Sequence, residues 1–102
     1  MAIVIRAPED EEKKAYLSTV WKVAREKHSI RCGTLTKNVS IKIKNYELYL
    51  KKGDYIMFYD DKGGVVESLG IRLKEKGYNV LALDKFTIRL LLLSYGENST
   101  VS

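Results

Sequence analysis

Cysteine and histidine, the side chains that most often supply nucleophilic and zinc-binding chemistry, are scarce in this chain. Its 102 residues include one cysteine, one histidine, one proline and no glutamine. Cys32 has no second cysteine with which to form a disulfide, and a zinc site needs about four ligands, which Cys32 and His28 do not supply. We therefore expect no catalytic residue, no metal site and no cofactor, in a protein that is not an enzyme.

Long hydrophobic runs are also missing. A membrane-spanning helix needs about 20 apolar residues, and the run from Leu90 to Leu93 is far shorter. The N-terminal stretch MAIVIRAPEDEE turns acidic early and lacks the basic start and long apolar segment of a signal peptide. The sequence predicts an intracellular protein that does not contact a membrane.

Cys32 and His28 have simple structural explanations. A lone cysteine in an apolar segment is usually a small buried residue, so we expect Cys32 to be buried in a strand. His28 stands at the end of a predicted helix, where a cationic side chain interacts favourably with the helix dipole. The pattern gives His28 no nucleophile within reach.

Charge is unevenly distributed along the chain. The net charge is +5, but residues 1–53 contain twelve Lys/Arg and six Asp/Glu, whereas residues 54–102 contain six and seven. A basic half allows nucleic-acid contact, and it equally describes a lysine-rich, solvated sheet face. The candidate nucleic-acid contacts are Lys42, Lys44, Lys51 and Lys52.

Two helices are predicted from apolar periodicity. In residues 9–28, apolar side chains recur at helical spacing, at Leu17, Val20, Trp21 and Ala24. Pro8 fits the first turn of this helix, and a tryptophan inside such a stripe is typical of a core residue. A second helix is predicted over residues 64–76, with Gly77 just beyond its end in the left-handed conformation.

Short alternating or apolar runs predict strands between and after these helices. They are expected at residues 2–6, 29–35, 38–44, 46–51, 55–59, 78–83 and 86–94. Three hairpins are predicted from neighbouring runs: 29–35 with 38–44, 46–51 with 55–59, and 78–83 with 86–94.

The order of these elements predicts an internal duplication. Residues 3–5 match 56–58 in their apolar pattern, and residues 39–43 match 86–90. We expect a single α+β domain built from two βαββ-like units, with two helices packed on a mainly antiparallel sheet. Repeat one covers about residues 1–52, repeat two about 53–96, and 97–102 form a loose tail. A ferredoxin-like βαββαβ arrangement is the alternative.

Leu91 and Leu93 are the main candidates for a binding surface. In the predicted strand they are apolar where the first half has the polar Lys44, which indicates either a central strand or an interface. Tyr46 and Tyr49 join them as candidate partner contacts, although strand alternation places these two tyrosines on opposite faces.

These residues predict a non-enzymatic binding module. We expect it to bind a protein or peptide at the cleft or the sheet edges between the repeats, and the partner to include a second copy in a homodimer. Binding of nucleic acid through the basic first half is the alternative.

Asp60 and Asp61 are the remaining candidates for a metal site. Adjacent strand residues point in opposite directions, so two neighbouring aspartates rarely converge on one ion. We interpret them as part of a turn and a helix cap, with Mg²⁺ binding left open.

The absence of glutamine, the abundance of lysine and tyrosine, and the duplicated pattern together resemble small proteins of filamentous viruses that infect hyperthermophilic archaea, the Acidianus filamentous virus group. The resemblance implies a viral protein of the host cytoplasm. It assigns no functional residue.

Overall fold

The computed structural model describes residues 2–58 and 64–95, the side chains of Ile43 and of residues 92–95 excepted. These ranges contain both helices and antiparallel strands, which confirms the predicted α+β class. The elements are β1 (Ala2–Ile5), α1 (Glu11–His28), β2 (Cys32–Thr34), β3 (Val39–Ile43), β4 (Tyr46–Leu50), β5 (Tyr55–Phe58), α2 (Val65–Glu75), β6 (Val80–Leu83) and α3 (Lys85–Tyr95).

The larger sheet has the strand order β2-β5-β1-β6, and all of its neighbouring strands are antiparallel. Without β3 and β4, the elements of this sheet run β1, α1, β2, β5, α2, β6 along the chain. This is the βαββαβ order of the ferredoxin-like fold, the alternative that the sequence predicted. The β3–β4 hairpin is inserted between β2 and β5, and α3 follows β6.

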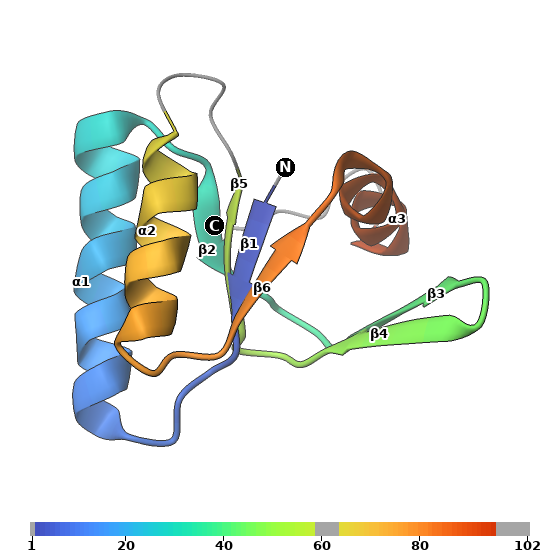
Figure 1. Ribbon diagram of the computed structural model, residues 1–102, viewed down its shortest axis with the longest axis horizontal. Helices are drawn as coiled ribbons and strands as arrows, with labels where there is room; N and C mark the ends of the chain where they lie inside the picture. The colour runs from blue at the N-terminus through green and yellow to red at the C-terminus, as the bar shows by residue number, and fades with distance from the viewer. Residues whose placement is uncertain (1, 59–63, 96–102) are drawn as a thin grey trace.

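Three layers are stacked in the molecule. Figure 1 shows α1 and α2 together on one side of the sheet, and the β3–β4 hairpin with α3 on the other side. Both faces of the larger sheet are therefore covered. For this reason β1 is a continuous apolar run, and all four of its residues are buried.

The strands supply alternate residues to two hydrophobic cores. Ile3 and Ile5 of β1 face α1 and α2, whereas Ala2 and Val4 face the hairpin and α3. The core under the helices contains Ile3, Ile5, Leu17, Trp21, Ala24, Ile30, Cys32, Tyr55, Met57, Val66, Leu73 and Tyr78. The core under the hairpin contains Ala2, Val4, Leu35, Val39, Ile41, Leu48, Leu50, Ile56, Leu83 and Leu91.

Helix α1 begins two residues later than its proline suggested. Asp10 is the N-cap, and its carboxylate accepts hydrogen bonds from the backbone N–H groups of Glu12 at 2.8 Å and Lys13 at 3.3 Å. Pro8 therefore precedes the helix rather than forming its first turn. At the other end, Ser29 has a left-handed conformation and closes the helix.

The prediction that Trp21 is a core residue is confirmed. Its side chain is 2% exposed, and its indole Nε1–H donates to the carbonyl of Ile56 at 2.9 Å. The ring also meets Tyr55 edge-on, with 5.5 Å between centroids. These contacts fix α1 against β5.

Helix α2 ends at the predicted glycine. Gly77 has φ of 93°, and its N–H donates to Lys74 while the N–H of Tyr78 donates to Leu73. This pair of bonds is the Schellman pattern, which satisfies carbonyls at the end of a helix.

Residues 85–95 form α3, so the strand predicted over 86–94 and its hairpin with 78–83 are wrong. Asp84 starts the helix, because its carboxylate accepts a hydrogen bond from the N–H of Thr87 at 2.7 Å. Ile88 and Leu91 lie three residues apart and both pack on the core under the hairpin. That spacing places them on one face of a helix, but on opposite faces of a strand.

The strands of the other two predicted hairpins also pair differently from the prediction. Strand β3 pairs with β4 through the two-residue turn Lys44–Asn45, in which Lys44 has φ of 53°. Strand β2 pairs with β5, and β5 also pairs with β1. Residues 29–35 and 46–51 therefore do not pair with the segments predicted for them.

The structure does not confirm the internal duplication. Each half contains a βαβ unit, β1-α1-β2 and β5-α2-β6. The second match between the halves, however, aligned residues 39–43 with 86–90, and these lie in strand β3 and helix α3. The units therefore do not extend to the predicted βαββ form.

Candidate functional site

The structure places Leu91 in the core. Its side chain is 1% exposed in α3 and packs with residues of β3 and β4. The prediction that Leu91 contacts a partner is therefore wrong, and the core alternative is correct. Leu93 lies on α3, but its side chain is outside the described residues.

Tyr46 and Tyr49 are both exposed but do not form one surface. Tyr46, 60% exposed, stands opposite Ile43 at the tip of the hairpin, whereas Tyr49, 46% exposed, stands opposite Ser40. Alternation puts the Tyr49 side chain on the outer face and that of Tyr46 on the face that carries Leu48. One flat ligand cannot stack on both rings.

The four candidate lysines are exposed, yet they are spread over the hairpin. Lys42 stands opposite Glu47, and the carboxylate of Glu47 accepts a hydrogen bond from the hydroxyl of Ser40. Lys44 lies in the turn at the tip. Lys51 and Lys52 follow β4 at the base. The hairpin therefore has separated positive charges, one of them beside a carboxylate.

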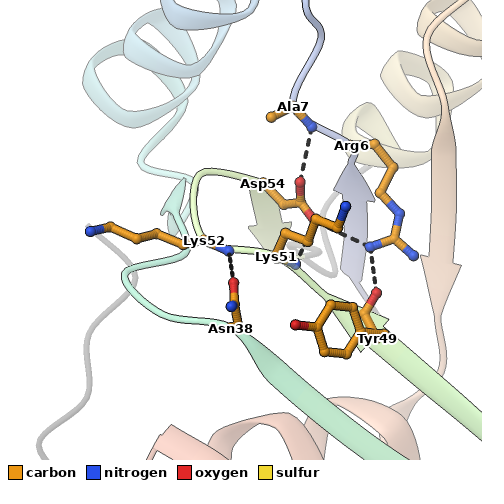
Figure 2. Close-up of polar contacts among 7 residues, drawn as sticks. All are labelled: Arg6, Ala7, Asn38, Tyr49, Lys51, Lys52 and Asp54. Atoms are coloured by element: carbon orange, nitrogen blue, oxygen red, sulfur yellow. Dashed lines mark hydrogen bonds and ion pairs between the residues drawn. The ribbon is translucent and has the colours of Figure 1, made fainter.

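A polar junction joins the base of the hairpin to the sheet (Figure 2). The side chain of Asp54, which is 2% exposed, accepts hydrogen bonds from the backbone N–H groups of Ala7 at 3.0 Å and Lys51 at 2.9 Å. The guanidinium of Arg6 donates to the same carboxylate at 3.1 Å and to the carbonyl of Tyr49 at 2.6 Å. Asp54 therefore connects β1, β4 and the turn before β5.

This junction borders an open cavity of about 500 Å³ whose walls include Arg6, Lys51 and Lys52. The cavity resembles an anion site in its charge, but its central groups are already paired. Arg6 is bound to Asp54, and the N–H of Lys52 donates to the side-chain oxygen of Asn38 at 2.8 Å. The side chain of Lys52 extends away from the carboxylate in Figure 2. The geometry indicates a structural role.

The prediction that Cys32 is a buried strand residue is confirmed. Its side chain is 2% exposed, and Sγ lies 3.5 Å from the carbonyl oxygen of Trp21. Burial raises the pKa of the thiol above its ordinary value, so the neutral form is favoured. His28 is exposed in the last turn of α1, at an apolar groove of about 450 Å³ between α1 and α2.

No cluster of three or more His, Cys, Asp or Glu side chains suited to a metal ion occurs within residues 2–58 and 64–95. Asp60 and Asp61, like the tail 97–102, lie outside the described residues. In the same described ranges, no helix combines the length and apolar character needed to cross a membrane.

Strand β6 is an edge strand of the larger sheet. It pairs with β1 on its inner side, and within the described part of the chain no strand pairs with its outer side. Its sequence, VLAL, contains no charged residue or proline, the residues that usually protect an edge from further pairing. As far as the described residues go, the outer side of β6 is therefore open to another strand.

The register shows which backbone groups face outward. The N–H of Arg6 donates to the carbonyl of Asn79 at 3.0 Å, one step beyond the pair of Ile5 with Val80. Hydrogen-bonded and non-bonded pairs alternate along an antiparallel ladder. Val80 and Ala82 therefore direct their N–H and C=O groups away from β1, toward the open side.

One flank of α2 lies over this open side. Ile71 is 57% exposed, and with Glu67 and Lys74 it lines a cavity of about 300 Å³ whose floor includes Val80 and Ala82. We call these five residues the β6 edge surface. It combines free main-chain groups, an apolar side chain and one charge of each sign.

Sequence reasoning did not identify these residues. It did not single out Ile71, and it paired residues 78–83 with residues 86–94 in a hairpin. The available signal was Ile71 itself, because a large apolar residue outside the stripe of an amphipathic helix has no core to enter.

Comparison with known proteins adds no relative to this description. No protein-family model, no curated protein and no solved structure matches the chain.

Proposed function

We propose that this chain is a non-enzymatic protein-binding module that takes an extended segment of a partner along the outer side of β6. The observation that carries the proposal is the uncharged edge of β6, which no described strand pairs with, beside the exposed Ile71. An added strand would satisfy the outward N–H and C=O groups of Val80 and Ala82.

The two parts of the β6 edge surface have different tasks in this proposal. Main-chain hydrogen bonds to Val80 and Ala82 provide affinity, and they form with many partner sequences because they do not involve side chains. Ile71 overhangs the place where alternate side chains of the added strand would lie, and so selects apolar residues there. Glu67 and Lys74, at the rim of the cavity, favour partner residues of opposite charge beside them.

A displayed library of random peptides, each long enough to form one strand, tests the proposal. The chain should select peptides with apolar residues at alternate positions. Ala82→Pro removes the outward N–H at position 82 and should abolish their binding, whereas the matched control Ala82→Ser keeps that N–H and should retain it. Circular dichroism checks that both variants are folded. Selected peptides that bind Ala82→Pro unchanged would refute the proposal, and so would a monomeric chain that selects no peptide.

Nucleic-acid binding by the hairpin is the alternative function. It is supported by the exposure of Lys42, Lys44, Lys51 and Lys52. Fluorescence anisotropy with single- and double-stranded DNA and RNA, repeated as salt increases, measures it. Tight binding with a steep salt dependence, weakened by Lys51→Glu and Lys52→Glu but not by Ala82→Pro, would favour this alternative. Absence of binding at low salt would exclude it.

An intracellular location completes the proposal, with the host cytoplasm as the compartment if the protein is viral. Cys32 is a free, buried thiol, which suits a reducing compartment. Fractionation of cells that produce the protein, followed by detection with an antibody, tests this. Recovery outside the cells would contradict it.

A further inference from the structure

We infer that the occupant of the β6 edge surface is a second copy of this chain. A two-fold axis relates the two copies and passes between their Leu81 residues, and we call it the axis through Leu81. The inference rests on the proposed function, because it uses the same open edge, and it adds the identity of the partner. Backbone register, helix position and side-chain charge agree on this one axis.

The backbone register limits where the axis can lie. Val80 and Ala82 are the outward-facing residues of β6, and a hydrogen-bonded antiparallel pair needs one such residue from each strand. An axis through Leu81 pairs Val80 of each copy with Ala82 of the other. An axis at Val80 or Ala82 would leave one of these residues without a counterpart. The axis through Leu81 therefore uses all outward groups of β6.

The middle of helix α2 lies level with Leu81 along the strand. A Cβ atom on Gly70 would lie 3.4 Å from Cγ2 of Ile3 and 3.8 Å from Cγ1 of Val80. Ile3 is the register partner of Ala82. Gly70 therefore lies above the stretch from Val80 to Ala82, level with Leu81, and Ile71 follows it directly.

The position of α2 on the sheet suits contact with its symmetry mate. The helix packs on both β1 and β6, and neighbouring strands are about 4.8 Å apart. Two copies of α2 would then run antiparallel at about 10 Å from each other, which is a normal distance between packed helices. Ile71, which is 57% exposed in one chain, lies where the two helices would meet.

The charges on this flank are complementary between copies. Glu67 lies four residues before Ile71, and Lys74 lies three residues after it. In an antiparallel pair of α2 helices centred beside Ile71, Glu67 of one copy faces Lys74 of the other, and symmetry repeats the contact. Within one chain the two side chains are about two turns apart, and neither has an ion pair among the described residues.

Exchanging the two charges tests the inference. Glu67→Lys and Lys74→Glu each replace attraction by repulsion at both symmetric contacts, and each should raise the dissociation constant of the dimer about ten-fold. The double variant Glu67→Lys/Lys74→Glu restores opposite charges across the axis and should return the constant close to that of the wild type. Sedimentation equilibrium of the full chain, at low and high salt, measures these constants.

Three results of the sedimentation experiment would overturn the inference. They are a wild-type chain that stays monomeric over the whole concentration range, a dimer that does not respond to either single reversal, and a double variant that dimerises no better than the single ones. Recovery in the double variant supports it, because a chain with no contact between Glu67 and Lys74 of its own gains nothing internally from the exchange.

Ala82→Pro separates this inference from the proposed function. A monomeric wild-type chain that binds peptides, and loses them on Ala82→Pro, keeps the proposed function and refutes the second-copy inference. A dimer that is unaffected by Ala82→Pro refutes the placement of the dimer at β6. A dimer that Ala82→Pro abolishes, with Ala82→Ser unchanged, supports both.

Discussion

Removing the carboxylate of Asp54 should be among the most damaging single changes to the hairpin. Asp54 is 2% exposed and accepts hydrogen bonds from two backbone N–H groups and from the guanidinium of Arg6. Asp54→Ala leaves the N–H groups of Ala7 and Lys51 without this acceptor. It also leaves Arg6 without its counter-ion.

The structure gives the size of the effect. Breaking a buried ion pair by removing one partner costs about 3–5 kcal/mol. The side chain of Arg6 is 29% exposed and keeps its hydrogen bond to the carbonyl of Tyr49, so water and that carbonyl compensate part of the loss. We therefore expect Asp54→Ala to lower the free energy of unfolding by about 3 kcal/mol. This is a large share of the total free energy of unfolding of a typical domain, which is about 5–15 kcal/mol.

Urea unfolding followed by tryptophan fluorescence measures this loss. Trp21 is the one tryptophan of the chain and is buried against β5, so its emission reports on the core. Glu47→Ala is the matched control, because it removes an exposed carboxylate from the same hairpin. Its cost should stay within about 0.5 kcal/mol.

The two variants together test whether the buried carboxylate connects the hairpin to the sheet. If Asp54→Ala cost about as little as Glu47→Ala, the buried carboxylate would not connect the hairpin to the sheet. Asp54→Asn gives a further check, because an amide retains one acceptor oxygen and should show an intermediate loss.

Three further predictions concern other parts of the fold. Leu91→Ala should lower the free energy of unfolding by about 2–5 kcal/mol, measured by urea titration, because Leu91 is core; a neutral result would contradict this placement. Cys32 should react slowly with iodoacetamide in the native state and rapidly in denaturant, because burial raises the pKa of its thiol; equal rates would contradict its burial. The backbone N–H and the hydroxyl of Thr87 lower the pKa of Asp84, so this carboxylate stabilises the fold above its unfolded pKa of about 4 and loses that effect as pH falls through its lower folded pKa. Asp84→Asn should therefore reduce the decline of stability in acid, which thermal melts from pH 6 downward would show; an unchanged acid limb would contradict it.

Sequence reasoning was most successful where the signals are local. The period of Leu17, Trp21 and Ala24 identified α1, and these three side chains are buried as expected. Gly77 marked the end of α2 because its positive φ suits a residue without a side chain. Such features depend on residues within a few turns of each other, which a sequence shows directly.

Helix α3 was missed because its apolar residues fit two periods. Phe86, Ile88 and Leu90 alternate like a strand, whereas Ile88 and Leu91 have helical spacing. The deciding signal was Asp84, which lies between the two segments predicted as a hairpin (78–83 and 86–94) but is the cap of a helix. Leucine-rich runs also favour a helix over a strand.

Strand pairing was missed because it depends on distant residues. Residues 29–35 and 38–44 are neighbours in sequence, yet β2 pairs with β5, about 23 residues further along the chain. The pairing of β3 with β4 had a local signal, since two alternating runs are separated by the two residues Lys44 and Asn45. The β6 edge surface was missed for the same reason, because an edge is recognised only when the order of all strands is known.

The covering of the second sheet face restricts where this protein can bind. RNA-binding domains built on a four-stranded sheet stack bases on aromatic residues of that sheet. Here Val4 and Ile56, in the corresponding face, are fully buried under the hairpin and α3. A ligand on that face would have to displace a packed hydrophobic core. Of the two edges of this sheet, β2 is three residues long with Gly33 at its centre, whereas β6 is longer and lies beside Ile71. We therefore expect substitutions at the edge of β6 to weaken the proposed binding of a partner strand more than substitutions on the outer face of the hairpin.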